Sequence, residues 1–416
     1  MNNSSTNKNF YLILILGSLT AIGPLSIDMY LPAFPDIAKN LHTSVAQVML
    51  SLSSFFIGIS AGQLIYGPLL ERFGRKKPLY AGLCIYLLAS IGCALATSVN
   101  ALIILRLTQA LGSCAGMVTS RAMVRDLFEV KQNAKIFSTL MLVVAVSPII
   151  APTAGGYITA VFGWRYVFAM LVIINIIIIA GVYLLLPESK KPDPNFSLKA
   201  GAIIKNFATI IKHPQFYAYA LTGAIAYGGL CAYISGSPYV FMEIFRVNEK
   251  QYGWIFALIA VGIISASQVN TLALKKYSSE QIIKAASFCQ SVIGITLAVI
   301  SLTGFSELFT TIFFIFLFLC CQGFIFPNAS ALSLAAFGNN AGSASALMGA
   351  IQMSVGAGAS ALVSFLENGT SLPMAGVMAC CSLTAFLVFS LGRKIIIHRS
   401  SKEEVEKEDV EMIGTL

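Results

Sequence analysis

Charged residues are scarce in this sequence. Asp, Glu, Lys and Arg together make up 11% of its 416 residues, whereas 57% are hydrophobic. So little charge could not cover the surface of a water-soluble fold of this size, so the composition excludes an ordinary soluble protein and indicates that lipid surrounds most of the chain. The formal net charge of +9 therefore indicates basic residues that are distributed unequally between the loops on the two sides of a membrane. We expect no nucleic-acid partner.

The residue types of catalytic and metal sites are also missing from the apolar stretches. The three histidines, His42, His213 and His398, fall in loops or tails, and the nine cysteines lie inside apolar runs without the spacing of metal ligands. No pair of acids, His–Cys set or nucleophile arrangement lies in or beside those runs. We therefore predict no metal, no cofactor and no enzymatic activity, which disfavours the alternative of a membrane-embedded enzyme.

What the sequence has instead is a series of twelve long apolar runs. They cover approximately residues 11–34, 45–66, 79–97, 101–120, 137–160, 164–186, 216–241, 252–274, 282–303, 308–332, 343–366 and 373–392. Because the hydrocarbon core of a bilayer is about 30 Å thick and takes about 20 helical residues to cross, each run predicts one transmembrane helix. The first run lacks a small-residue cleavage site and contains Asp28, so we expect it to be retained and not removed as a signal peptide.

The basic residues between the runs predict the orientation. If both termini are cytoplasmic, 22 of the 27 Lys and Arg residues lie in cytoplasmic segments, four lie in outer loops, and Arg106 lies within a run. Lys and Arg are retained on the cytoplasmic side because their transfer across the bilayer is costly. We therefore predict a multi-pass membrane protein with both termini in the cytoplasm.

The longest segment between runs divides the chain into two halves. We predict an N-terminal six-helix bundle over residues 1–187, a cytoplasmic connector over 188–214, a C-terminal six-helix bundle over 215–393 and a charged cytoplasmic tail over 394–416. Apolar residues of the connector share one helical face, which predicts a helix on the membrane surface; an unstructured linker is the alternative. We expect the tail, which is rich in acidic residues, to be disordered.

Basic residues are concentrated between the second and third runs. The stretch Gly67-Pro-Leu-Leu-Glu71-Arg-Phe-Gly74-Arg75-Lys resembles the signature loop of the major facilitator superfamily, with Glu71 where that pattern has Asp. The resemblance implies an all-α membrane protein in which twelve transmembrane helices form two six-helix bundles around a central cavity. It also implies that this stretch belongs to a charge latch at the inner gate, whereas a solvated surface cluster is the alternative.

Other stretches resemble one family within this superfamily, the twelve-span drug:proton antiporters. Ile27–Pro35, Arg106–Gly112 and Pro148–Gly156 are similar to its motifs in the first, fourth and fifth spans. Shorter strings resemble its Bcr/CflA group, named for bicyclomycin and chloramphenicol efflux; they are Arg121–Phe128, Ser235–Tyr239, Gly323–Asn328 and Gly342–Gly349. The resemblance implies export of small amphipathic drugs against protons across a bacterial inner membrane, which confers antibiotic resistance. We expect the protein to act as a monomer. Proton-linked uptake of a small metabolite by the same fold is the alternative.

Two charged side chains lie well inside the predicted spans. Because an ionised group in hydrocarbon costs at least ~2.5–3.5 kcal/mol, Asp28 and Arg106 must each face a partner or an aqueous cavity. A rise of about 1.5 Å per residue places Asp28 about 25 Å from the inner face and Arg106 about 7–8 Å from the outer one, which is nearly the same level. Asp28 is the predicted proton site, or else it orients the kink at Pro32. The resemblance implies that Arg106 modulates that site, whereas a fixed link between the first and fourth spans is the alternative.

Polar residues elsewhere in the spans complete the predicted site. A substrate cavity is predicted from side chains that could either line it or join helices, namely Tyr30, Gln109, Ser237, Asn328 and Gln352. Pro152, Gly155 and Gly156 allow helices to approach closely and bend, so they predict either a hinge of the transport cycle or simple close packing. Arg125 and Asp126, at the inner end of the fourth span, are predicted to join the charge latch of the signature loop.

Overall fold

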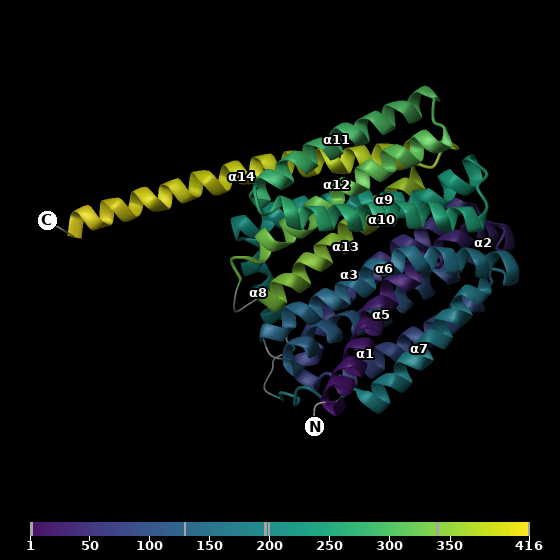
Figure 1. The fold of residues 1–416 in the computed structure, drawn as a ribbon, viewed down its shortest axis with the longest axis horizontal. Helices are drawn as coiled ribbons and strands as arrows, with labels where there is room; N and C mark the ends of the chain where they lie inside the picture. The colour runs from purple at the N-terminus through teal and green to yellow at the C-terminus, as the bar shows by residue number, and fades with distance from the viewer. Residues whose placement is uncertain (1–2, 129, 195–197, 199, 338–340, 415–416) are drawn as a thin grey trace.

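The computed structural model describes residues 3–128, 130–194, 198, 200–337 and 341–414, and almost all of them are helical. Figure 1 shows two bundles of long helices. The first bundle contains α1 (Asn3–Asp28), α3 (Val45–Phe73), α4 (Lys76–Ala94), α5 (Val99–Leu127), α6 (Val130–Phe162) and α7 (Arg165–Leu185). The second contains α9 (Pro214–Pro238), α10 (Glu249–Ala273), α11 (Ser279–Thr303), α12 (Leu308–Leu334), α13 (Ala341–Phe365) and α14 (Leu372–Gly414). The shorter elements are η1 (Leu31–Ala33), α2 (Phe34–Asn40), α8 (Ala200–Ile211) and the π-helical η2 (Tyr239–Ile244).

The long helices have the length and composition of membrane spans. Among the described residues, eleven are long and apolar enough to cross a membrane. The remaining long helix, α9, has 25 residues, which at about 1.5 Å per residue is also enough to cross the hydrocarbon core. It is rich in Tyr, Gly and Ala, and most of its side chains are buried against its neighbours α12, α13 and α14. The fold is therefore that of a multi-pass helical membrane protein.

The first span is interrupted just beyond Asp28. α1 ends at this residue, and the chain continues through η1 into α2. Pro32 has no N–H group to bond to the carbonyl four residues earlier, which belongs to Asp28, so an uninterrupted helix would lose a hydrogen bond there. Instead, the Ala33 N–H group bonds to the carbonyl of Tyr30 over 3.1 Å. The interruption leaves Asp28 at a helix end inside the protein.

The apolar runs end at residue 66 and resume at residue 79, and the resemblance implies that a loop connects them. The structure corrects this expectation, because most of these residues are helical. α3 continues to Phe73 and α4 begins at Lys76. The run Leu69–Arg72 consists of residues with high helix propensity, so the second span extends beyond its apolar part. Gly74 then ends the helix with a φ of +82°, a conformation that glycine adopts without the steric penalty of other residues.

The segment between the two bundles contains the helix α8. Its Ile210 side chain is buried and, together with Phe207, packs with Phe216 of α9 and Leu347 of α13. Ile204 on the same helix is exposed. α8 therefore lies against the end of the second bundle and leaves part of its apolar surface uncovered.

The charged tail is helical, which corrects the prediction of disorder. α14 continues without interruption from the last span to Gly414 and is 43 residues long. In Figure 1 its yellow end leaves the bundle as a single helix. The tail contains many Glu and Lys residues, and both have high helix propensity. Its acidic composition is therefore as compatible with a helix as with a disordered segment.

The two bundles meet along two helix pairs, α3 with α13 and α6 with α10. On α3, the hydroxyl groups of Ser53 and Ser60 bond to those of Ser360 and Ser354 on α13, each over 2.8 Å. Small side chains such as serine let helix backbones approach closely in a membrane. Hydrogen bonds between small serine side chains thus join α3 of one half to α13 of the other.

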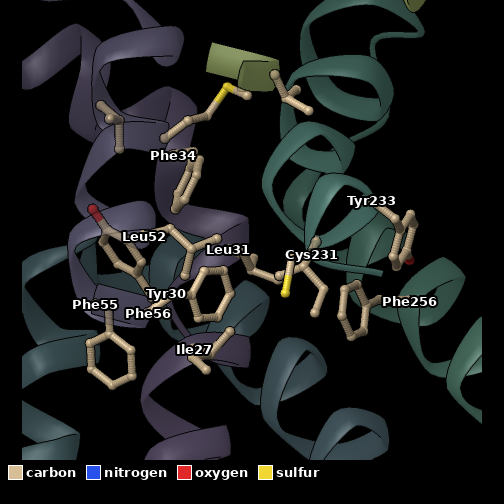
Figure 2. Packing of buried hydrophobic residues seen from close by; sticks show 14 of the residues in the cluster. Ile27, Tyr30, Leu31, Phe34, Leu52, Phe55, Phe56, Cys231, Tyr233 and Phe256 are labelled. Carbon is tan, nitrogen blue, oxygen red and sulfur yellow. The ribbon is translucent and has the colours of Figure 1, made fainter. Parts of the chain in front are cut away.

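The two ends of the bundles are formed by different elements. We call the end with the α3–α4 turn and α8 the connector end, and the opposite end, with η1, α2 and η2, the η1 end. At the η1 end, η1 contacts α9 and α10, and α2 contacts η2. Tyr30, Leu31 and Phe56 of the first half share one apolar cluster with Cys231 and Phe256 of the second (Figure 2). The halves are therefore packed together at the η1 end.

Candidate functional site

Arg106 lies inside the first bundle at the centre of a polar and aromatic cluster. Its guanidinium is fully buried and sits 4.2 Å from the ring centre of Phe55 and 4.4 Å from that of Tyr30. Nη1 donates to Gln109 Oε1 over 2.6 Å, and Nη2 donates to the Ser26 carbonyl over 3.0 Å. Aromatic faces and charge-assisted hydrogen bonds offset part of the cost of burying the cation. Arg106 therefore links α5 to α1.

Asp28 lies beside this cluster without joining it. Its side chain is 4% exposed, and within the described part of the chain its carboxyl group has no hydrogen-bond donor and no ion pair. The guanidinium of Arg106 binds the carbonyl of Ser26, so the two charged groups share a level of the bundle as predicted, but they form no pair. Tyr233 and Tyr252 of the second half lie within electrostatic range of the Asp28 carboxyl group. Asp28 is thus close to the boundary between the halves.

Tyr30 and Gln109, two of the residues predicted to line a cavity, belong to the Arg106 cluster. Both are fully buried. The Tyr30 hydroxyl pairs with Ser51 Oγ over 2.7 Å, and Gln109 donates to Ser90 Oγ over 2.7 Å. The first bond joins the residues between α1 and η1 to α3, and the second joins α5 to α4, both within the first half. Contact of Tyr30 or Gln109 with a substrate stays a prediction.

The other three predicted cavity residues lie in the second half and are buried too. The Ser237 hydroxyl pairs with that of Tyr252 over 2.8 Å, and Asn328 donates to Asn270 Oδ1 over 2.7 Å. Gln352 lies on α13, which packs against α3 of the first half. Ser237 and Tyr252 are notable because Tyr252 is also near Asp28. Substrate contact at these positions likewise stays a prediction.

Two glycines of α6 lie where this helix approaches its neighbours closely at the η1 end. A Cβ atom at Gly155 would overlap the carbonyl oxygen of Met29, and one at Gly156 would overlap that of Glu249 on α10. Pro152 lies one turn earlier in α6. This part of α6 therefore packs against both α1 and the second half. A hinge at Pro152, Gly155 and Gly156 stays a prediction.

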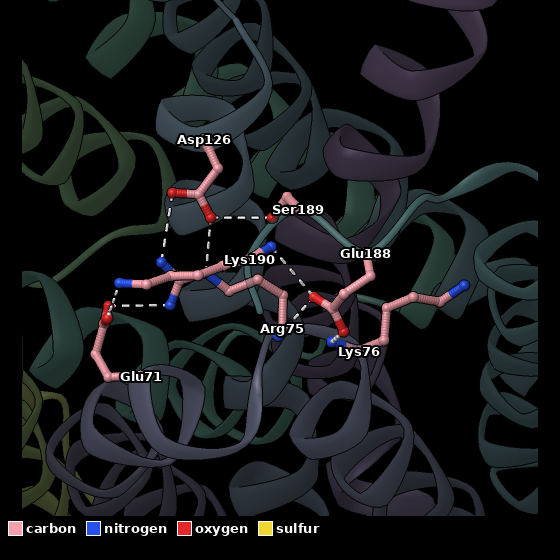
Figure 3. A network of polar contacts seen from close by, with 7 residues as sticks. All are labelled: Glu71, Arg75, Lys76, Asp126, Glu188, Ser189 and Lys190. Carbon is pink, nitrogen blue, oxygen red and sulfur yellow. Dashed lines mark hydrogen bonds and ion pairs between the residues drawn. The ribbon is translucent and has the colours of Figure 1, made fainter. Parts of the chain in front are cut away.

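A network of charged side chains lies at the connector end (Figure 3). Arg75 donates from Nε to Asp126 Oδ2 over 2.7 Å and from Nη1 to Glu71 Oε1 over 3.0 Å. Lys190 pairs with the second oxygen of Glu71. Glu188 accepts a hydrogen bond from the backbone N–H of Arg75 over 2.8 Å. The network thus fixes the turn after Gly74 from several sides.

Arg75 is the centre of this network, and its side chain is only 3% exposed. Burial by itself lowers the pKa of the guanidinium. The hydrogen bonds and charges of Asp126 and Glu71 outweigh burial, so the pKa of Arg75 lies above the ordinary value of arginine. The cation is therefore stabilised by its surroundings at every pH at which the protein would work.

The network of Arg75 differs from the predicted charge latch. It includes Glu188 and Lys190, which the sequence did not predict, and it leaves out Arg125 and Gly67, which the sequence did predict. Glu188 and Lys190, in the segment after α7, are members, and the only signal for them was an acid placed directly after the end of the sixth apolar run. Within the described residues, no bond joins Arg125 to the network carboxylates; its Nη1 lies 3.2 Å from the Cβ position of Gly342, at the start of α13. Gly67 has nothing within 4 Å of its Cβ position.

The fold and the sequence can be compared with known proteins. A solved structure described as a D-xylose-proton symporter superimposes with a TM-score of 0.70, covering 91% of this chain and 97% of that chain at 15% sequence identity. An uncharacterized transporter of Bacillus subtilis, YdgK, is 32% identical over 391 residues, which are 94% of this chain and 97% of the relative. A bicyclomycin resistance protein homolog of Haemophilus influenzae is 32% identical over 384 residues, which are 92% and 96% of the two chains.

The family model of the Major Facilitator Superfamily matches residues 16–361. These residues include the signature stretch, the Arg106 cluster, Asp28 and most of the second bundle. The chain is a transporter and not an enzyme, and it belongs to the major facilitator superfamily.

Proposed function

We propose that this protein is a proton-coupled antiporter that exports small amphipathic drugs across a bacterial inner membrane. Membership of the major facilitator superfamily supports transport of a small molecule. The name of the relative from Haemophilus influenzae, a bicyclomycin resistance protein homolog, supports a drug as that molecule. The observation that carries proton coupling is the buried carboxyl group of Asp28, which has no partner among the described residues.

Asp28 is suited to bind and release a proton. A carboxylate without a donor or a counter-ion is strongly disfavoured in a medium of low dielectric constant, whereas the neutral acid is tolerated. When water reaches the group from one side, the charged form becomes accessible and the proton can leave. Opening of the two ends in turn would then let Asp28 load a proton from outside and release it inside. A membrane potential of 100 mV supplies about 2.3 kcal/mol for each charge moved.

We assign the connector end to the cytoplasm. This places 22 of the 27 Lys and Arg residues on the cytoplasmic side, as the retention of basic loops requires. The η1 end then faces the outside, and its packed cluster is the closed outer gate. One chain supplies both bundles and both gates, so we propose that the monomer is the transport unit.

Arg106 is proposed to be the fixed link between α1 and α5. Its two hydrogen bonds go to the Ser26 carbonyl and to Gln109, and neither goes to Asp28. Arg106 then acts on Asp28 by holding the end of α1 in place. This favours the fixed-link alternative over direct modulation through an ion pair.

The two halves are proposed to rock against each other so that the ends open in turn. At the outer end, α6 must then separate from α10 and η1 from α9, and the contacts of Gly155 and Gly156 define where these surfaces part. The Arg75 network lies within one half, so its proposed role is to keep α3, α4 and α5 together as one body during this motion. Residues that are buried in the closed cluster, such as Ser237, become candidates for substrate contact once the halves separate.

The test is transport by the purified protein in liposomes with an imposed pH gradient and radiolabelled bicyclomycin as the probe. Antiport predicts that bicyclomycin moves opposite to the protons and that Asp28→Asn abolishes gradient-driven movement. Glu243→Gln, which changes a partly exposed acid at the η1 end, should keep it and serves as the matched control. Movement of bicyclomycin in the same direction as protons would overturn antiport in favour of proton-linked uptake.

A further inference from the structure

Two arginines lie on the same face of α5 but in contrasting surroundings. They are 15 residues apart, about 22 Å along the helix axis. The face carries, at helical spacing, Arg106, Ala110, Ser113, Met117 and Arg121. Arg106 is sealed and hydrogen-bonded, whereas Arg121 is partly exposed and, within the described residues, has no hydrogen-bond or ion-pair partner.

Three carboxylates at the connector end are engaged with other residues. Glu71 and Asp126 both pair with Arg75. In the second half, Glu280 pairs with Arg393 over 2.9 Å and accepts a hydrogen bond from a tyrosine. None of these three carboxylates pairs with Arg121.

The surroundings of Arg121 place it toward the boundary between the halves. One turn before it on the same face, the Met117 Sδ atom lies 3.4 Å from the Cβ position of Gly23 on α1. One turn after it, the Arg125 guanidinium reaches the start of α13 in the second half, at Gly342. Arg121 thus lies on α5 between a helix of its own half and the approach of the other half.

We propose that Arg121 is an anion subsite on the transport path, which binds a carboxylate or sulfonate group of an amphipathic organic anion. This inference rests on the proposed transport function and names one class of its substrates. A guanidinium inside a helix bundle needs a counter-charge or water, and its planar set of donors matches two oxygens of such a group. An anion that enters from the cytoplasm meets Arg121 before it reaches the level of Asp28.

The experiment compares two probes that share one fluorophore, dansyl acid with its sulfonate and dansylamide with a neutral sulfonamide. Binding to the purified full-length protein in detergent is followed by dansyl fluorescence. Arg121→Gln should raise the Kd of dansyl acid at least about tenfold, because a charge-assisted hydrogen bond is lost, and should change that of dansylamide less than about twofold. Arg121→Lys, which keeps the charge without the planar donors, should give an intermediate Kd for dansyl acid.

Arg125→Gln is the matched control, since Arg125 lies one turn further on the same helix and is exposed. It should leave the ratio of the two Kd values unchanged. Unchanged binding of dansylamide shows that the Arg121 variants are folded. If Arg121→Gln is unstable, two other measurements test the anion subsite: the Kd of dansyl acid for Arg121→Lys, and displacement of dansyl acid from the wild type by naphthalene-2-sulfonate. Equal effects on both probes, or no effect on either, would overturn the anion subsite. Gradient-driven transport of dansylamide tests the proposed function separately, because that probe carries no anion.

Discussion

The Arg106 guanidinium donates to the backbone carbonyl of Ser26 over 3.0 Å, and it forms no pair with the carboxyl group of Asp28 two residues later. The only buried acid of the first span is therefore left free of the buried base at its own level. An ion pair between them would hold Asp28 in its charged form and oppose protonation. Their separation instead leaves the carboxyl group able to change its protonation state while Arg106 keeps the helix end in place.

This arrangement predicts that substrate binding releases protons from Asp28. In weakly buffered detergent solution, addition of bicyclomycin to the protonated wild-type protein should lower the pH, because substrate favours the state in which the acid has lost its proton. Asp28→Asn should bind bicyclomycin without releasing protons. A pH-indicator dye measures the change. Equal proton release from wild type and variant would place the exchangeable proton on another group.

The hydrogen bonds of Arg106 predict a loss of stability in Arg106→Lys. The lysine ammonium cannot reach the Ser26 carbonyl and Gln109 with the same planar geometry, so the variant should lose about 1–3 kcal/mol for each bond that is not replaced. Thermal unfolding in detergent measures the shift in Tm. The control is Arg246→Lys, which changes a side chain that is 80% exposed and should leave Tm unchanged. Equal Tm values for both variants would contradict the link.

The close approach at Gly156 predicts that Gly156→Ala disturbs the outer gate. The new methyl group would overlap the carbonyl of Glu249, and overpacking of this kind costs about 1–3 kcal/mol. Transport in liposomes should fall and Tm should decrease. Gly376→Ala, at a helical glycine with nothing within 4 Å of its Cβ position, should be neutral in both assays. Normal transport by Gly156→Ala would show that the gate surfaces do not need this contact.

The Arg75 network predicts coupling between Arg75 and Asp126. A double-mutant cycle of Arg75→Ala and Asp126→Ala should give an interaction energy of about 1–3 kcal/mol, as for contacting groups in one network. Because the pKa of Arg75 is raised, its contribution is present below the ordinary pKa of arginine and is lost only above the higher folded value. The coupling should therefore be constant from about pH 6 to about pH 9. A coupling that disappears within this range would require another titrating member.

Sequence patterns predicted the long helices well and their polar contacts poorly. Apolar runs located the spans because lipid requires about 20 apolar residues in succession. The helical extension through Leu69–Arg72 was missed because charged residues there suggested a loop, although they favour helix equally. Glu188 joins Arg75 across 113 residues of sequence, a contact that depends on how the helices are packed. For the same reason, depth along a helix placed Arg106 and Asp28 at one level but could not show which carbonyl the guanidinium would choose.

α9 has a consequence for how the protein enters the membrane. Among the described residues, it is the one long helix outside the eleven that meet the length and composition of membrane spans. Its tyrosines, glycines and alanines are covered by α12, α13 and α14. A segment that misses this criterion partitions less readily into lipid by itself than the other spans. The helices that cover it are synthesised later, so stable insertion of α9 by the translocon should await the last third of the chain, and truncation before α12 should leave it exposed to quality-control proteases.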